Sequence, residues 1–243
     1  MPESQILVGA GGLHWHFREG EDDHLALGGH ETQFLTLMKA LLPDGGLFVD
    51  VGAHIGLWSL VMAQKGSVVA LEANPATFDA LVANYGLNEE SLPHDVQMYQ
   101  FAAWDGEARL RLTYIGDKET GGSVRVGESG DSELTVPAHP LDDIADLLEG
   151  VSMIKIDVEG AEARVLRGAH QILQKNKPTL FIEMLDEYLE DPRIREEVLA
   201  ELESHEYVWE DGFQYGAAYY ILAKDPYAGM EYPGEVVRAG DPA

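Results

Sequence analysis

The chain has 243 residues, and 43 aspartates and glutamates against 16 lysines and arginines give it a formal charge of −27. This negative field repels phosphate polymers and anionic membranes, so neither a nucleic acid nor a membrane is expected as a partner. The absence of cysteine excludes disulfides, thiolate nucleophiles and sulfur-ligated zinc. No run of 18 or more apolar residues indicates a membrane span.

The first 30 residues lack the charged-then-apolar order of a signal peptide, so a soluble cytoplasmic protein is expected. Four histidines gather there with Trp15 and Phe17. These residues would form either a lid over an acceptor site or an ordinary patch of surface histidines and packed aromatics. We expect this N-terminal segment, 1–30, to precede a single domain of residues 31–243, because one α/β domain accounts for that length.

Hydrophobic periodicity in the first part of the domain predicts helix, strand, helix, strand and helix in that order. Apolar residues at helical spacing predict a helix that ends before Pro43, and LFVDV predicts a buried strand. A helix over 56–65 and the strand VVALE follow. Asn74 and Pro75 predict a helix start, with Asn as the N-cap and Pro at the first helical position.

The second part of the domain continues the alternation of strands and helices. In chain order we predict a strand over 96–101, a hairpin or loop excursion over about 107–136, a helix over 141–150, a strand over 152–157, a helix over 160–175, a strand over 178–184, a helix over 193–205 and two closing antiparallel strands over 207–211 and 217–223. Alternating helices and near-continuously apolar strands predict an α/β fold with a doubly wound, mainly parallel sheet.

The stretch FVDVGAHIGLWS, residues 48–59, joins a strand to a helix through a glycine turn. A dinucleotide would require G-x-G-x-x-G, whose second glycine lets the backbone approach the pyrophosphate. His54 lies near the point where that bare backbone is needed. The acid Asp50 on the strand and Glu72 at the end of the next strand instead suit a ligand with an amine and ribose hydroxyls, such as S-adenosylmethionine.

Each expected cofactor contact has an ordinary structural alternative. The carboxylate of Glu72 would accept hydrogen bonds from both ribose hydroxyls, or it is only a strand-end acid. The turn would let the backbone approach the methionyl group, or it is only a tight turn. Ala103 belongs to the end of the following strand, residues 101–105, which would reach the adenine edge, and Ala73 directly follows Glu72. The expected cofactor-binding set is therefore Asp50, Gly52, Ala53, His54, Gly56, Glu72, Ala73 and Ala103.

Four segments together resemble the FkbM family of S-adenosylmethionine-dependent methyltransferases: FVDVGAHIGLWS, ALEANP, AAWDGEARL and MIKIDVEGAEARVLRGA. The resemblance covers residues 31–184, and KIDVEGAE is its most specific part. It implies a seven-stranded, Rossmann-like methyltransferase sheet and an acceptor that is a hydroxyl on a natural product or sugar. His54 stands where the family usually has Asn, and Glu31 matches a family glutamate.

Carboxylates at the ends of two predicted strands are the candidates for the chemistry. A hydroxyl nucleophile must lose its proton to a base within hydrogen-bond reach. Asp157 would face the methyl group and the acceptor, and Glu159 would position or deprotonate the acceptor. Glu31 and Glu183 are the expected acceptor-binding residues. Alternatively, Asp157 caps the following helix and Glu159 only favours its N-terminal dipole.

Other roles are open to the polar residues of this region. A divalent cation held by Asp157, Glu159 and Glu183 is an alternative, but no histidine falls at ligand spacing and we expect no metal. His54 is a second candidate base. Lys155, within its strand, would pair with a carboxylate or cover the sheet edge, and it is assigned no catalytic role. The glycine-rich excursion over 116–131 is the expected determinant of acceptor choice.

The sequence therefore predicts a cytoplasmic O-methyltransferase that uses S-adenosylmethionine on a hydroxyl of a small molecule, natural product or sugar. An NAD-dependent oxidoreductase is the alternative from another enzyme class, and a non-catalytic relic that binds the cofactor for stability is the non-enzymatic one. N-methylation remains open, as does the oligomeric state, including a homodimer.

If the acid excess is an adaptation to a salty cytoplasm, added salt should stabilise the fold by screening the repulsion between the carboxylates. The melting temperature should then rise steadily as the salt concentration increases into the molar range. A scanning-fluorimetry series in KCl measures this, and a flat response would discard the idea.

Overall fold

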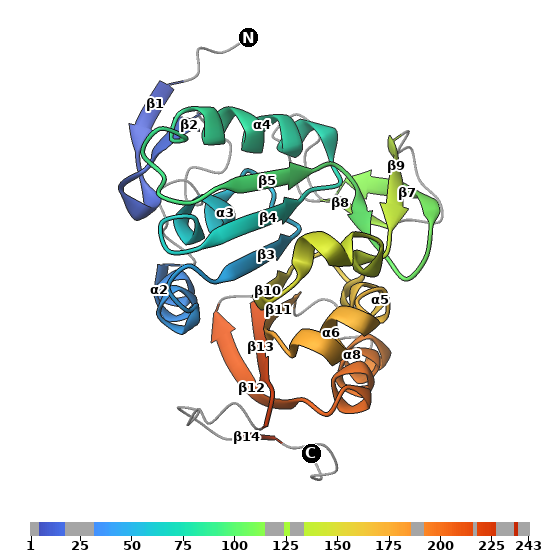
Figure 1. Cartoon of the computed structure of the whole chain (residues 1–243). Helices are drawn as coiled ribbons and strands as arrows, with labels where there is room; N and C mark the ends of the chain where they lie inside the picture. The colour runs from blue at the N-terminus through green and yellow to red at the C-terminus, as the bar shows by residue number, and fades with distance from the viewer. Residues whose placement is uncertain are drawn as a thin grey trace.

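A computed structural model describes residues 5–17, 32–114, 124–126, 134–185, 192–215, 218–226 and 236–237. A mixed sheet forms the middle layer of the domain, and helices pack on both of its faces (Figure 1). From edge to edge the sheet contains β14 (Val236–Val237), β12 (Val208–Tyr215), β13 (Ala218–Lys224), β11 (Thr179–Leu185), β10 (Val151–Ile156), β3 (Leu47–Val51), β4 (Ser67–Leu71) and β5 (Val96–Tyr99).

The strand directions confirm the predicted doubly wound, mainly parallel architecture. The strands from β11 through β10, β3 and β4 to β5 run parallel. The closing strands β13 and β12 are antiparallel, as predicted, and the two-residue β14 extends the seven expected strands by one. The carboxyl ends of five parallel strands therefore lie along one edge of the sheet, which is where ligands bind in such folds.

Helices cover both faces of the sheet. One face carries α2 (Thr32–Leu41), α3 (Leu57–Met62) and α4 (Pro75–Gly86), and the other carries the 3₁₀ helix η3 (Leu141–Leu148), α5 (Glu162–Arg167), α6 (His170–Asn176) and α8 (Pro192–Ser204). None of the described helices has the length and apolar character needed to cross a lipid bilayer.

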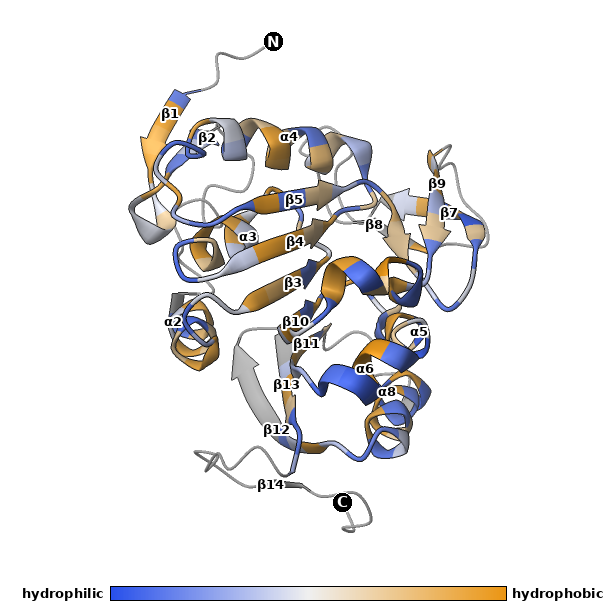
Figure 2. Cartoon of the chain, in the orientation of Figure 1, coloured by the Kyte–Doolittle hydropathy of each residue, from blue (hydrophilic) through white to orange (hydrophobic). Residues whose placement is uncertain are grey.

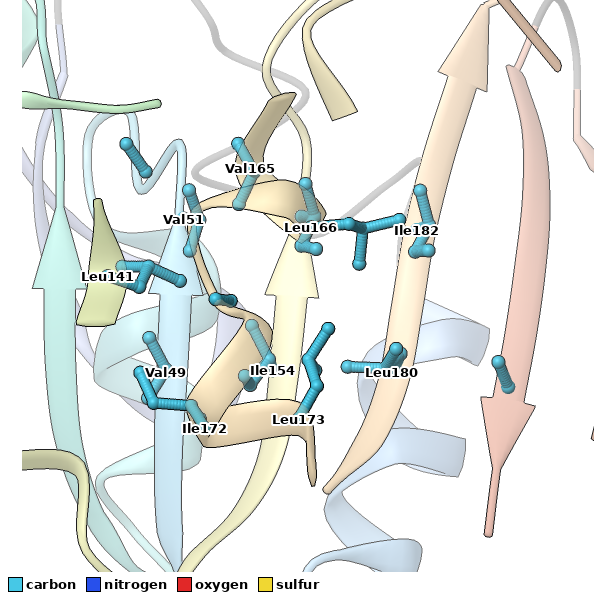
Figure 3. Close-up of a cluster of buried hydrophobic side chains, with 14 of the residues drawn as sticks. Val49, Val51, Leu141, Ile154, Val165, Leu166, Ile172, Leu173, Leu180 and Ile182 are labelled. Atoms are coloured by element: carbon cyan, nitrogen blue, oxygen red, sulfur yellow. The ribbon is translucent and has the colours of Figure 1, made fainter. Parts of the chain in front are cut away.

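Strand alternation divides the apolar core into two layers. Successive strand residues point to opposite faces, and Figure 2 shows apolar residues concentrated along β3 and β4. In Figure 3, Val49 and Ile154 pack toward Leu166 and Ile172 of the α5–α6 side. Phe48, one residue from Val49, packs in the other layer with α2 and α3.

The predicted excursion forms strands of a second, four-stranded sheet beside the central one, together with β6 (Ala102–Ala103), which precedes it. The order in this sheet is β6, β9 (Leu134–His139), β7 (Ala108–Tyr114) and β8 (Val124–Val126). Leu110, Leu112, Val136 and Ala138 form its small apolar core. Residues 115–123 and 127–133 of the excursion lie outside the described residues, so most of the loop expected to choose the acceptor does too.

The described part of the N-terminal segment packs on α4. The strands β1 (Gln5–Val8) and β2 (His14–Phe17) form an antiparallel hairpin around η1 (Ala10–Gly12). Trp15 is fully buried, and the backbone N–H groups of His14 and His16 donate to the side-chain oxygens of Asn88 and Asn84. The proposed lid is not tested, because residues 18–31, Glu31 included, lie outside the described part.

The helix predicted over 160–175 is wrong as a single element, because the chain breaks into α5 and α6 near Gly168. Asp142, from the distant η3, accepts hydrogen bonds from the N–H groups of Gln171 and Ile172 at 2.9 and 3.1 Å and so caps α6. Gly168 lies against Trp104, whose carbonyl oxygen would be 1.9 Å from an added Cβ. The break therefore depends on partners that local periodicity does not contain.

Gly168→Ala should destabilise the fold by about 1–3 kcal/mol or more, because backbone rather than a flexible side chain occupies the space. Gly106→Ala is the matched control, since nothing lies within 4 Å of its added Cβ. Urea unfolding of both variants measures the effect. Equal stability of the two would contradict the close approach of Gly168 to the Trp104 backbone.

Candidate functional site

A cavity of about 330 Å³ opens at the carboxyl ends of β3, β4 and β10. Many of the residues expected from the sequence line it: Gly52, Ala53, His54, Glu72, Ala73, Ala103, Asp157, Glu159 and Glu183. Phe101 and Trp104 add aromatic surface, and Leu110 and Leu112 of β7 add aliphatic surface. The structure thus brings together residues from across the domain around one cavity.

The glycine turn after β3 is shaped by the close approach of β10. Gly52 has φ +82°, and a Cβ there would lie 1.8 Å from the carbonyl oxygen of Asp157, so no side chain fits. Its N–H and that of Ala53 both donate to the Leu71 carbonyl at 2.9 Å. The glycine at position 52 is therefore required by the close approach of Asp157, and the turn that it allows lies on the cavity wall.

Glu72 links the two turns at the ends of β3 and β4. Its Oε2 accepts from the backbone N–H of His54 and its Oε1 from that of Asn74, both at 2.8 Å. The side chain is nearly buried yet lines the cavity. Each carboxylate oxygen has a second lone-pair direction, so Glu72 retains acceptor capacity for a ribose diol, and that role stays a prediction.

His54 occupies a left-handed backbone conformation, with φ +51°. Outside glycine, this region is adopted mostly by Asn, Asp and His. The backbone of His54 is therefore committed to the turn and to Glu72, and its side chain is not required for that hydrogen bond. The cofactor contact predicted for the His54 side chain stays a prediction.

Asp50 and Gly56 belong to the cofactor-binding set expected from the sequence, but neither is among the residues lining the cavity. Asp50 is fully buried beneath the turn, where its Oδ2 accepts a 2.6 Å hydrogen bond from Ser59 of α3. Burial raises the pKa of Asp50, and the nearby Lys155 opposes that shift. Gly56 begins α3, and a Cβ there would lie 2.5 Å from Leu81. Asp50 and Gly56 therefore hold the start of α3 against the sheet and do not contact the cavity.

Of the two alternatives left open for Lys155, the structure shows the pairing with carboxylates. Its buried Nζ donates to Asp157 Oδ2 at 3.0 Å and to the Gly52 carbonyl at 3.2 Å, and lies 3.6 Å from Asp50 Oδ1. The lysine pairs across the sheet with Asp50. A lysine inside an otherwise apolar strand was the available signal, because a buried charge requires a partner.

The carboxylates that follow β10 and the one within β11 face the cavity. Asp157 is ion-paired with Lys155, and Glu159 lies in a left-handed conformation with φ +56°. Glu183 accepts a 3.1 Å hydrogen bond from the Tyr220 hydroxyl. Within the described residues, no three carboxylates or histidines gather closely enough to hold a metal ion.

The residues present fit S-adenosylmethionine. Bare backbone at Gly52 would hold the methionyl group, the Glu72 carboxylate the ribose, and Phe101 with Ala103 the adenine. The fit rests on the carboxylate of Glu72 and the aromatic and apolar surface of Phe101 and Ala103 on the wall of the same cavity. A glycine turn, a strand-end acid and an apolar wall on a doubly wound sheet define a methyltransferase-type domain.

The family model for the Methyltransferase FkbM domain matches residues 50–209. The chain therefore belongs to the FkbM methyltransferase family, and the predicted family and its cofactor, S-adenosylmethionine, are confirmed. The NAD-dependent oxidoreductase, the alternative from another enzyme class, is set aside because the matched family is one of methyltransferases. The crystal structure of Methyltransferase FkbM from Methylobacillus flagellatus superposes with a TM-score of 0.52 at 18% identity, covering 74% of this chain and 44% of that one.

Two curated relatives are each 30% identical to the chain. Methyltransferase 1 of Beauveria bassiana matches over 53% of this chain and 60% of its own length. Hexuronic acid methyltransferase AglP of Haloferax volcanii matches over 59% of this chain and 58% of its own length. The chain thus aligns with about three fifths of each of these relatives.

Glu162 lies next to the site but is fully buried, and its Oε1 accepts a 3.0 Å hydrogen bond from the Gly160 N–H. Burial raises the pKa of Glu162 to about 7, although the Gly160 N–H partly opposes the shift. Between pH 4.5 and 7 the folded chain therefore keeps a proton that the unfolded chain loses. The contribution of the Glu162 carboxyl to the free energy of unfolding is therefore greatest below pH 4.5, and it decreases as the pH rises from 4.5 to 7.

Glu162→Gln should remove this dependence while keeping the oxygen that accepts from Gly160. Relative to wild type, the variant should gain about 2–3 kcal/mol in free energy of unfolding between pH 4.5 and 8. Urea titrations of both proteins across that range measure the gain. A wild-type-to-variant difference that does not change with pH would contradict the raised pKa.

Proposed function

We propose that the chain is an O-methyltransferase that acts in the cytoplasm on a hydroxyl of a small molecule, natural product or sugar. One observation carries the proposal: the carboxylates of Asp157 and Glu159 line the same cavity as the glycine turn and Glu72. A proton acceptor is thereby within the cavity that fits the cofactor. The name of the Haloferax relative, a hexuronic acid methyltransferase, supports a sugar among the candidate acceptors.

S-adenosylmethionine, when bound, supplies an electrophilic methyl group and leaves as a neutral thioether. In this proposal the protein holds the acceptor oxygen in line and close, which accounts for most of the catalysis of such a displacement. Glu159 takes the hydroxyl proton onto its carboxylate as the new bond forms. Asp157 complements positive charge in the cavity and is held in place by Lys155 at 3.0 Å.

Asp50, Lys155 and Asp157 form a group of two carboxyl groups and one ammonium. The lysine Nζ lies 3.6 Å from Asp50 Oδ1 and 3.0 Å from Asp157 Oδ2. Burial raises the pKa of Asp50 and so shifts it toward its protonated form, in which the group is neutral; with both acids ionised the group carries one excess negative charge. Of the two acids, Asp157 faces the cavity and Asp50 does not. The group is positive in neither state, so it is compatible with a cationic ligand such as a sulfonium with an amine and does not attract an anionic one.

Glu159→Gln and Asp157→Asn should each lower kcat by about 100-fold or more, because they remove the base and the cavity-facing charge. The melting temperature should change by less than about 4 °C. Turnover is measured as S-adenosylhomocysteine formed with a panel of hydroxyl acceptors. Glu203→Gln, on the exposed surface of α8, is the control and should match wild type.

A parallel loss of turnover and of thermal stability would favour the purely structural role of the two acids. Cofactor binding that is unchanged in both variants, with no turnover on any acceptor even in wild type, would instead identify a non-catalytic relic. Methylation of amines but not hydroxyls would replace O-methylation by N-methylation.

A further inference from the structure

A second cavity, of about 230 Å³, adjoins the cofactor cavity. The two share Trp104, Val126, Glu159 and Ala161 on their walls. Arg164 of α5 and Ile194 and Glu197 of α8 line the second cavity but not the first. A group bound there would meet the cofactor cavity at the wall that contains Glu159.

The backbone places Glu159 at this shared wall under strain. Its φ is +56°, and the next residue, Gly160, has φ +96°. A left-handed conformation is unusual for Glu and costs free energy, and such strain concentrates at functional sites. The strained turn is accounted for if the carboxylate must serve both cavities.

The side chain of Arg164 is fixed but still accessible. Its guanidinium lies 5.4 Å from the centre of the Trp104 ring and pairs with Asp105 Oδ2 at 2.5 Å. The side chain is 49% exposed. A guanidinium has five N–H donors, so the contact with Asp105 leaves donors for a ligand in the cavity. Stacking and pairing together pre-organise these donors.

The cavity therefore offers hydrogen-bond donors and acceptors within a small space. Arg164 can only donate, whereas the carboxylates of Glu159 and Glu197 accept. Ala161, Ala163 and Ile194 contribute apolar wall, and Trp104 an aromatic ring. At about 230 Å³ the space falls below the ~300–1,000 Å³ of sites for drug-sized ligands, so it suits a single ring.

We propose that this second cavity is the acceptor site and that it binds one sugar ring, with the hydroxyl to be methylated against Glu159. The inference rests on the proposed methyltransferase function. A sugar ring carries hydroxyl donors for Glu159 and Glu197, oxygens that accept from Arg164, and C–H faces for the apolar wall. A phenol has a single hydroxyl and could contact only one of these donors and acceptors, whereas a sugar ring could contact all of them.

A neutral hexose and a hexuronic acid share this chemistry and differ at Arg164. A hydroxyl oxygen of the hexose would accept one hydrogen bond from the guanidinium. A hexuronate carboxylate would form a stronger charge-assisted pair. The two sources are therefore distinguished by how much each depends on the charge of Arg164.

The test measures acceptor binding to the full chain saturated with S-adenosylhomocysteine, so that no turnover occurs. Calorimetry and ligand-observed NMR with a methyl hexoside, a methyl hexuronoside and a phenol give the affinities. Arg164→Gln removes the positive charge and most of the N–H donors, and Ile194→Trp fills the second cavity from a residue that does not line the first. Arg111→Gln, which removes the same charge from the exposed surface of β7, is the matched control.

We expect at least one sugar to bind to wild type, and its affinity to be at least tenfold lower in both Arg164→Gln and Ile194→Trp. Arg111→Gln should bind the sugar as wild type does, and no variant should change the affinity for S-adenosylhomocysteine. A hexuronoside preference that disappears in Arg164→Gln assigns the carboxylate to Arg164, and equal binding of both sugars assigns a hydroxyl. Sugar binding unaffected by either variant, or binding of the phenol alone, would overturn the proposal.

Failure of the wild-type chain to bind S-adenosylhomocysteine would instead overturn the proposed function, and the acceptor site with it. Binding of S-adenosylhomocysteine without binding of any sugar would overturn the acceptor proposal alone.

Discussion

The site depends on one buried ammonium group held between two carboxylates. Lys155 joins Asp50, which is tied to α3 through Ser59, to Asp157 and to the carbonyl of Gly52. One residue of β10 therefore connects the glycine turn after β3, the acidic wall of the cavity and the helix α3. Removing the ammonium of Lys155 would leave the fully buried Asp50 without its counter-charge, which is strongly destabilising. The architecture of the sheet and the chemistry of the cavity thus share a single polar cluster.

On the other side of the cavity, Glu72 likewise connects separate segments of the chain through its carboxylate. Its two oxygens hold the N–H groups of His54 and Asn74, so the turns after β3 and β4 are tied together as one unit. Pre-organised turns need no reordering when a ligand binds, which reduces the cost of association. The turns that line the cofactor cavity are therefore pre-organised for binding. Glu159, in its left-handed conformation, lies on the wall between this cavity and the second one.

The sequence predicted the features that local chemistry determines. The helix start at Asn74 and Pro75, the strand LFVDV and the glycine turn each follow from neighbouring residues. The left-handed backbone at position 54 also explains why His can replace the Asn usual in the family, since both residues tolerate that conformation. The cavity lining of Glu72, Asp157 and Glu159 followed from their places at strand ends.

The features that local patterns missed depend on contacts between distant segments. Asp50 was expected in the cavity, but the pairing of β3 with β10 directs it to Lys155 and α3. The break near Gly168 depends on Asp142, and the second cavity depends on α8 meeting α5 and Trp104. Register and helix docking bring these groups together, and neither is encoded in a window of a few residues.

The most direct test of the account is calorimetric titration of the full chain with S-adenosylmethionine, S-adenosylhomocysteine and NAD at low and high salt. The account predicts one-to-one binding of the first two, weakened by Glu72→Gln, and no binding of NAD. Binding of NAD alone, or no binding of any of the three, would contradict it.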